Sequence, residues 1–177
     1  MNPNKPAPPD LQARFRQQFV KPTPGPVLVV GSALYPTRPN WRQWHPDGIG
    51  VDMIPGDGVD YVANLETEVL PVQFTHIECV SVLEHAERPW LLAANLEAML
   101  AEGGSLFFSS PWVWRFHGYP VDRWRFSHLA LPVLFPSIEW RDVRYRCGDE
   151  LTESERMPKF KDGLLTRMEI MGWGVKR

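Results

Sequence analysis

Short apolar runs bounded by turn residues recur along the chain, and their length and order predict the strands of a sheet. The run Val27–Val30 is followed by Gly31, a pattern typical of a strand that is buried on both faces. Turn residues separate this run from the later ones. Further strands are predicted over residues 48–53, 60–64, 74–82 and 104–111.

The clearest helix is predicted to begin at Pro89 and to stop before the pair Gly103 and Gly104. A proline suits the first turn of a helix because its missing N–H would have no partner there. The apolar residues recur at helical spacing, so the helix has one face for a core. These residues are Leu92, Leu96, Met99 and Leu100.

The C-terminal part is predicted to hold one short helix and two strands. Ser127 would cap the helix, and Pro132 limits its length. Apolar and charged residues alternate over residues 138–146, which predicts an exposed or edge strand, and residues 166–175 form a last strand. Because strands alternate with helical or loop crossovers, we expect an α/β fold with a mostly parallel sheet of about seven strands.

The N-terminus differs from the rest in its proline content. Residues 1–26 carry seven prolines, and each removes a backbone donor and restricts the residue before it. We therefore predict a Pro-rich tail there and a single domain over residues 27–177. Within the tail, Asp10 could cap a short helix over residues 11–20 that lies over the domain as a lid. Its apolar stripe would be Leu11, Phe15 and Phe19.

Composition and charge narrow the possible functions. The 177 residues suffice for one domain with a sizeable core. Lys plus Arg number 19 and Asp plus Glu number 21, so the net charge of −2 does not favour nucleic acid as a partner. No stretch approaches the ~20 apolar residues of a membrane span, and the N-terminus has no secretory pattern. We expect neither membrane insertion nor secretion.

Cysteine and histidine usage gives no sign of a disulfide framework or a metal site. Cys79 and Cys147 lie far apart, outside any zinc-ligand spacing. A reduced, cytoplasmic setting fits this usage best. His45 and His128 are predicted to lie at the surface.

The residues that end the predicted strands are the first candidates for a binding site, because ligands of such sheets bind at the carboxyl ends of the strands. Gly31 ends the first strand with two small residues after it, and Asp52 ends the second, 21 residues later. A carboxylate there can accept hydrogen bonds from both hydroxyls of a ribose. A tight turn with a capping or solvated Asp52 explains the same pattern equally well. Asn64 and residues 81–85 end the next two strands, where they could recognise an adenine edge.

Residues 27–131, about 60% of the chain, resemble the class I S-adenosylmethionine-dependent methyltransferases. More narrowly, they are similar to the small bacterial methyltransferase domains of the type 11 kind, which implies a Rossmann-like sheet and S-adenosylmethionine as cofactor. The resemblance is carried by VLVVGSA, GIGVDMIPGDGVDYVANLE, FTHIECVSVLEHAERPW, NLEAMLAEGGSLFFSSPW and HGYPVDRWRFS.

The resemblance implies a role for particular positions. Residues under the methionine part of the cofactor would be Gly31, Ser32 and Ala33. Residues around the nucleoside would be Asp52 on the ribose, Met53 beside the adenine, and Asn64 and Leu65 on the adenine. Ser81 would begin the segment below the sulfonium, and the pair Glu84 and His85 would be structural or would border the acceptor. The acceptor side would hold His117, Tyr119, Asp122, Trp124 and Arg125.

The chain also departs from the family pattern. Val29 stands where the family usually has an acidic residue, and fewer glycines follow Gly31. Three prolines between residues 34 and 48 leave room for only a short helix or none, and no helix fits between the second and third strands. The fold is therefore predicted to be trimmed. A catalytically inactive relative that binds a ligand or serves as a scaffold is the alternative to an enzyme.

The aromatic loop over residues 112–126 holds three of the eight tryptophans. Its His117, Tyr119 and Asp122 are candidates to orient or deprotonate an acceptor hydroxyl, with His85 as a further candidate base. In the structural alternative, Asp122 pairs with Arg125 and the rings only bury area. The chain has neither the glycine turn of a dehydrogenase nor a Walker-type phosphate loop. We expect O-methylation of a small or glycan-like acceptor.

Overall fold

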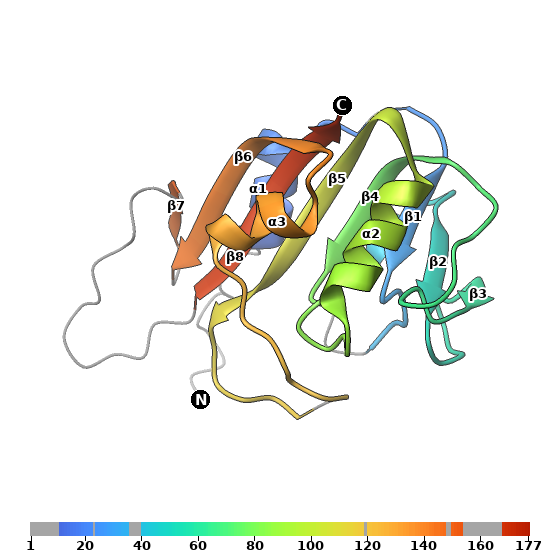
Figure 1. The fold of residues 1–177 in the computed structure, drawn as a ribbon, viewed down its shortest axis with the longest axis horizontal. Helices are drawn as coiled ribbons and strands as arrows, with labels where there is room; N and C mark the ends of the chain where they lie inside the picture. Colours follow the sequence, from blue (N-terminus) through green and yellow to red (C-terminus); the bar gives the residue numbers. More distant parts are fainter. Residues whose placement is uncertain (1–10, 23, 36–39, 119, 148–149, 154–167) are drawn as a thin grey trace, which may run out of the picture.

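The computed structural model contains one eight-stranded sheet in the order β3-β2-β1-β4-β5-β8-β6-β7 (Figure 1). The structure describes residues 1–177 except 1–10, 23, 36–39, 119, 148–149 and 154–167. The strands are β1 (Val27–Val30), β2 (Ile49–Asp52), β3 (Tyr61–Val62), β4 (Phe74–Val80), β5 (Leu100–Val113), β6 (Ile138–Cys147), β7 (Glu150–Glu153) and β8 (Met168–Lys176).

One half of the sheet is parallel and consists of β3, β2, β1, β4 and β5. Here β1 lies between β2 and β4, with Val29 opposite Gly50 on one side and Glu78 on the other. The apolar run of β1 is explained by this central place, because both faces of the strand are covered. The predicted strands of this half are confirmed at their predicted places in the chain.

The other half is antiparallel, and β8 inserts between β5 and β6. The predicted strand over residues 138–146 exists, but its prediction as an edge strand is wrong, because β7 pairs with its outer side. Its alternating pattern comes instead from two sheet faces of different polarity. The α/β class and the Rossmann-like sheet are confirmed, with β7 as a short strand beyond the seven that were expected.

Helices α2 (Pro89–Met99) and α3 (Leu131–Leu134) cover the front face of the sheet in Figure 1. Leu92 and Leu96 of α2 are buried in the main core against Ile77 and Leu106 of the sheet. Leu100 was expected in the helix, but it begins β5 because its backbone is already extended there.

The second predicted helix is split into a 3-10 turn, η2 (His128–Ala130), and α3. Ser127 precedes η2 but makes no capping hydrogen bond with its side chain, so its predicted role as a cap is wrong. The turn is fastened instead by Tyr145, whose hydroxyl accepts from the His128 backbone N–H at 3.0 Å.

Helix α1 (Leu11–Phe19) lies behind the sheet, on the face opposite α2 and α3 (Figure 1). Phe15 is fully buried and stacks on Phe107 of β5 with 5.4 Å between ring centroids. The expectation that this stretch is a tail outside the core is therefore wrong for Phe15. The helix also does not cover the carboxyl ends of the strands, as a lid would, since its apolar stripe packs on the sheet itself. The division of the chain at residue 26 stays a prediction.

The back face beneath α1 is unusually polar for a sheet interior. Buried polar side chains there include Glu78 of β4 and Glu169 of β8. Burial raises the pKa of the Glu78 carboxyl, but the contacts with His45, His76 and Arg16 lower it well below its usual value. Each carboxylate is bound by a side chain of α1, Glu169 by Gln12 at 2.6 Å and Glu78 by Arg16 at 2.8 Å. These bonds hold α1 in register on the sheet.

Among the helices that the structure describes, none is long and apolar enough to cross a membrane.

Candidate functional site

A cavity of about 710 Å³ opens where the parallel strands end. Its wall comes from the residues after β1, β2, β3 and β4, from the start of α2 and from residues 120–123. This is the place where open α/β sheets bind ligands. The predicted site residues that line it are Gly31, Asp52, Met53, Asn64, Leu65, Ser81 and His85.

The backbone at the floor of the cavity is held in unusual conformations. Gly31 has a φ of 66°, and a Cβ there would lie only 2.5 Å from Cγ2 of Val82. Ser81 has a φ of 55° and is the only non-glycine residue with a positive φ in the described part of the chain. Such left-handed residues cost energy and are found where a structure must place a backbone precisely. Here they bring the ends of β1 and β4 together below the cavity.

Asp52 links the ends of β1 and β2. Its Oδ2 accepts from the Ala33 backbone N–H at 3.1 Å, and its Oδ1 accepts from the Ile54 N–H at 3.3 Å. Each carboxylate oxygen can accept a second hydrogen bond, so the group is oriented and still able to bind hydroxyls in the cavity. The two alternatives from the sequence, a capping role and a binding role, are compatible in this geometry.

Asn64 closes the turn after β3. Its side-chain Oδ1 accepts from the Glu66 backbone N–H at 3.0 Å, while the backbone N–H of Asn64 donates to the Glu68 carboxylate at 2.9 Å. The side-chain carbonyl is therefore occupied by the turn, and the amide nitrogen is the part suited to a ligand. Met53 stands at the cavity with 63% of its side chain exposed, which is a large apolar surface for one residue.

Two of the predicted residues lie next to the cavity without lining it. Ser32 is 1% exposed, and its carbonyl accepts from the Trp41 indole N–H at 2.9 Å. Ala33 donates its N–H to Asp52 and is absent from the cavity wall. Both residues support the wall, because they fix the loop that carries Gly31 against the end of β2.

The segment after β4 borders the far end of the cavity. Glu84 is fully buried and accepts a hydrogen bond from Ser110 at 3.1 Å. His85 reaches the cavity wall, and its Nδ1 lies 2.5 Å from the Val121 carbonyl oxygen. That bond places the proton on Nδ1 and leaves Nε2 as the basic nitrogen of the ring.

The predicted acceptor residues of the aromatic loop meet beside His85 rather than in the cavity wall. Asp122 is bound by the Arg125 guanidinium, with 2.6 Å between Nη2 and Oδ2, and by the His117 backbone N–H at 2.9 Å. The hydrogen bonds from Arg125 lower the pKa of the Asp122 carboxyl far below its usual value. The His117 ring lies against His85 with 5.2 Å between ring centroids, and its Nδ1 is 3.1 Å from Asp122. Tyr119 lies outside the described residues.

The local pairing of Asp122 with Arg125 is the arrangement that the structural alternative predicted. A carboxylate so strongly held in its ionised form is a poor proton acceptor near neutral pH. It can still fix the ring of His117, as a carboxylate fixes the histidine of many catalytic pairs. His117 and His85 are thus the nitrogen bases of this region.

Among the cavity-wall residues that sequence analysis missed are three with polar side chains, Tyr35, Glu66 and Arg123. Glu66 accepts from the Glu87 and Arg88 backbone N–H groups at 2.8 and 2.9 Å, so it ties the β3 turn to the start of α2. Arg123 donates to the His85 carbonyl at 2.8 Å. The only available signal was their closeness in sequence to predicted strand ends and to the aromatic loop, and this does not define which side chains turn inward.

Comparison with known proteins finds no matching family model and no matching curated protein. Solved structures do match. A methyltransferase from Anabaena variabilis aligns with a TM-score of 0.65 at 12% identity, over 95% of this chain and 84% of its own. The chain has the fold of the S-adenosylmethionine-dependent methyltransferases.

Two further structures with this methyltransferase fold contain S-adenosylhomocysteine. The N-methyltransferase NodS from Bradyrhizobium japonicum matches with a TM-score of 0.58 at 13% identity, over 85% of this chain and 77% of its own. The 1,6-didemethyltoxoflavin-N1-methyltransferase from Burkholderia thailandensis matches with a TM-score of 0.61 at 13% identity, over 93% and 75%.

The methyltransferase fold of this chain is trimmed, as predicted. Between β1 and β2, the described residues contain only the 3-10 turn η1 (Trp41–Gln43), and the segment between β2 and β3 has no helix. In the segment between β2 and β3, Asp60 accepts hydrogen bonds from the Gly50 N–H at 2.7 Å and from the Arg42 side chain at 2.8 Å. Side-chain bonds thus replace a crossover helix at this end of the sheet.

Proposed function

We propose that the protein is a methyltransferase that uses S-adenosylmethionine to methylate a small or glycan-like acceptor. One observation carries the proposal: Gly31, Asp52, Asn64 and Ser81, from the ends of four neighbouring strands, line a single cavity. Each of these residues suits one part of S-adenosylmethionine: the ribose, the adenine or the methionine part.

The residues present fit the cofactor. Asp52 would hold the ribose, since its oxygens keep hydrogen-bonding capacity toward the cavity. The amide of Asn64 and the apolar side chain of Met53 would hold the adenine. The left-handed turns at Gly31 and Ser81 leave backbone rather than side chains at the floor, where the methionine part would lie.

Bound S-adenosylmethionine would supply the methyl group from its sulfonium centre. The chain's own task is then to place the acceptor in line and to remove a proton, and placement provides much of the acceleration. We assign the proton-accepting role to His85, which lines the cavity, or to His117, whose ring packs against His85. Asp122 would position His117 through their 3.1 Å contact.

We propose an oxygen atom of a sugar or planar metabolite as the acceptor. The aromatic loop supports this, because aromatic faces suit sugar rings and planar molecules, and Phe116 is 75% exposed there. The net charge of −2 argues against a polyanion such as nucleic acid. Incubation with labelled cofactor and a panel of hydroxyl and amine acceptors would test the choice of atom, and transfer confined to amines would contradict it.

Cofactor binding is tested by isothermal titration with S-adenosylmethionine and S-adenosylhomocysteine. Asp52→Ala should weaken binding by about 1.5 to 3 kcal/mol, the usual loss for a hydrogen bond to a charged group. Asp57→Ala is the matched control, since this exposed carboxylate lies five residues away and does not line the cavity. Equal affinity of both variants and wild type would remove Asp52 from the site.

The scaffold alternative is favoured because the described residues between β1 and β2 and between β2 and β3 form no crossover helix. The enzyme and the inactive scaffold give different results in the labelled-cofactor assay. In this assay the His117→Ala, Asp122→Ala double variant is compared with wild type. An enzyme transfers label, and the double variant loses most of the rate. A folded protein that takes up no cofactor at millimolar concentration would support the inactive relative.

A further inference from the structure

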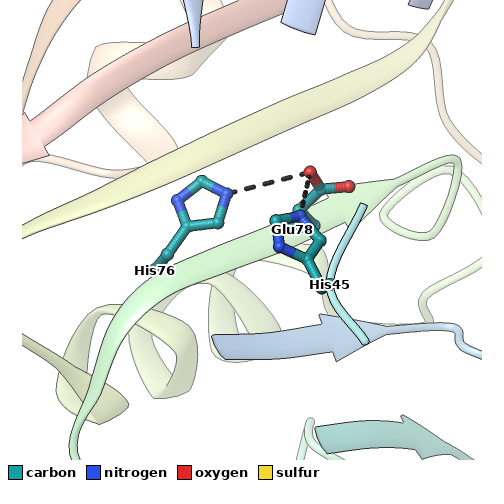
Figure 2. Close-up of side chains that lie close together, drawn as sticks. All are labelled: His45, His76 and Glu78. Atoms are coloured by element: carbon teal, nitrogen blue, oxygen red, sulfur yellow. Dashed lines mark hydrogen bonds and ion pairs between the residues drawn. The ribbon is translucent and has the colours of Figure 1, made fainter. Parts of the chain in front are cut away.

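Two histidines and a glutamate meet on the back face of the sheet, across the sheet from the cofactor cavity. His76 and Glu78 are two residues apart on β4, so their side chains share this face. His45 comes from the segment that follows η1. Figure 2 shows both imidazole rings directed at the same carboxylate oxygen of Glu78.

The three side chains have the spacing of metal ligands. His45 Nε2 lies 2.8 Å from Glu78 Oε1, and His76 Nε2 lies 3.8 Å from the same oxygen. All three ligand atoms lie within 4.8 Å of one another. Ligands of a tetrahedral zinc ion, at about 2.0 to 2.1 Å from the metal, lie roughly 3.3 Å apart. Shifts of about half an ångström would bring the two distances to Glu78 Oε1 to that value.

His76 carries an observation of its own that points to a ligand. The residue is fully buried, and its Nε2 has no hydrogen-bond partner among the described residues. A buried nitrogen without a partner is costly. The opposite nitrogen, Nδ1, lies 2.8 Å from the Ser105 hydroxyl. With Nδ1 donating to Ser105, Nε2 presents its lone pair to the cluster, as in histidines that bind metals.

Glu78 and its surroundings supply a fixed, ionised ligand. Its side chain is 2% exposed and is held by Arg16 through Nη2 at 2.8 Å and Nε at 3.1 Å. These bonds fix the carboxylate plane and keep Oε1 directed at the two imidazoles. A cavity of about 540 Å³, lined by His45, Glu78, Gln17 and Gln43, reaches the cluster from the α1 side.

We propose that His45, His76 and Glu78 form a binding site for a single zinc ion, with its fourth position open to this cavity. Two imidazole nitrogens and one carboxylate oxygen are a ligand set that zinc accepts, whereas magnesium and calcium require mainly oxygen ligands. On binding, the metal takes the place of the hydrogen bond between His45 Nε2 and Glu78 Oε1, and the ring binds as a neutral imidazole with its proton on Nδ1.

The proposed ion would fasten the segment after η1 to the middle of the sheet. The described residues of this segment contain no crossover helix, so a metal bond there would replace packing that a helix provides. The ion pair between Arg16 and Glu78 extends this connection to α1. The inference does not depend on cofactor binding. The cluster of His45, His76 and Glu78 lies on the back face of the sheet, whereas the cavity proposed for the cofactor lies at the strand ends, and the two share no residue.

Sequence analysis predicted no metal site and placed His45 at the surface. The side chain of His45 is 9% exposed, so that prediction is wrong. Its ring is covered because α1 and the sheet enclose it, which no local pattern shows. The ligands are 31 and two residues apart, a spacing that matches no known metal motif.

The first test is calorimetric titration of zinc into the full chain after treatment with a chelator. We expect one ion per chain. His45→Gln and His76→Gln should each weaken binding by at least about 100-fold, and Ser105→Ala by about 10- to 100-fold, as for loss of an outer partner. His128→Gln is the matched control and should bind as wild type, since its ring pairs with Tyr145 elsewhere. Circular dichroism must show that each variant is folded.

A second measurement on the unaltered chain keeps the test decisive if a variant unfolds. The chain has five histidines, and their ring nitrogens can be resolved by proton–nitrogen correlation spectroscopy. Zinc should shift Nε2 of His45 and His76. Shifts confined to His85 and His117, which with Glu84 form a second such cluster among the described residues, would overturn the proposal. Failure to bind zinc at micromolar concentration would also overturn it.

Discussion

Gly31 and Ser81 show how single residues shape the cavity at the strand ends. Both are left-handed, and each lies where a strand of the parallel half ends. Gly31 could be recognised in the sequence, because a glycine after a buried strand commonly takes this conformation. Ser81 could not, since a serine gives no local sign of a positive φ. The backbone N–H of Ser81 donates to the Ser109 carbonyl at 2.8 Å, a contact between β4 and β5 that the sequence does not show.

Gly31→Ala should lower both stability and cofactor affinity. The new methyl group would meet Val82 at 2.5 Å in a backbone conformation that alanine rarely adopts, at a cost of about 1 to 3 kcal/mol. Urea denaturation measures the loss. Gly56→Ala is the control, because a Cβ there has no atom within 4 Å, and its effect should stay within about 0.5 kcal/mol. Equal effects of the two substitutions would contradict the strain argument.

The ion pair of Asp122 predicts a pH dependence of stability. The folded protein lowers the pKa of this carboxyl through Arg125. Its contribution is therefore present above the unfolded pKa of about 3.9 and is lost as the pH falls through the lower folded value. Asp122→Asn should cost about 1.5 to 3 kcal/mol of unfolding free energy at pH 7.

The difference between wild type and Asp122→Asn should shrink as the pH falls below about 4, because the Asp122 carboxyl of the unfolded chain then takes up a proton while that of the folded chain stays ionised. Denaturation curves between pH 7 and pH 2.5 measure it. A difference that stays constant over this range would show that the ion pair does not stabilise the loop.

At the scale of elements, α1 packs on the back face of the sheet as part of the domain and is not a separate tail. Its apolar stripe packs on β5 and β8 through Phe15, while Gln12 and Arg16 bind two buried carboxylates. Proline content predicted a tail here, and that prediction is wrong for the buried Phe15. A stripe of three apolar residues is compatible with a lid, a partner surface or a core, and only the position of the sheet decides among them.

Phe15→Ala should destabilise the whole domain by about 3 to 5 kcal/mol, because a fully buried ring stacked on Phe107 leaves a cavity. Gln18→Ala, an exposed position on the same helix, is the control and should change stability by less than about 0.5 kcal/mol. The midpoint of guanidinium denaturation checks both. A loss of helicity with an unchanged midpoint would mean that α1 folds independently of the sheet.

Cofactor binding should be visible in the stability of the whole molecule. At a concentration of 100 times the dissociation constant, a ligand that binds only the folded state adds about 2.7 kcal/mol. For a chain of this size that raises the thermal midpoint by about 5 to 11 °C. S-adenosylhomocysteine should give this shift by differential scanning calorimetry, and Asp52→Ala should need a higher concentration to reach it. The absence of a shift in wild type would contradict the proposed function.

The order of strands, the main helix and the fold class could be predicted because they depend on local patterns. Apolar runs such as Val27–Val30 report burial on both faces, and Pro89 with the later glycines marks a helix by backbone chemistry alone. The strand-end residues Gly31, Asp52 and Asn64 followed from the same logic, since parallel strands present their carboxyl ends at one edge.

What the sequence could not determine depends on contacts between distant residues. The interior place of β6, the burial of His45 and Phe15, and the turning of Ser32 away from the cavity each require the full sheet to be assembled. Local pattern determined which segments become strands and helices, because hydrogen bonding and backbone restriction act within a few residues. The tertiary structure alone decided which side chains share a cavity or a buried cluster, because burial and pairing arise only between segments that the chain keeps far apart.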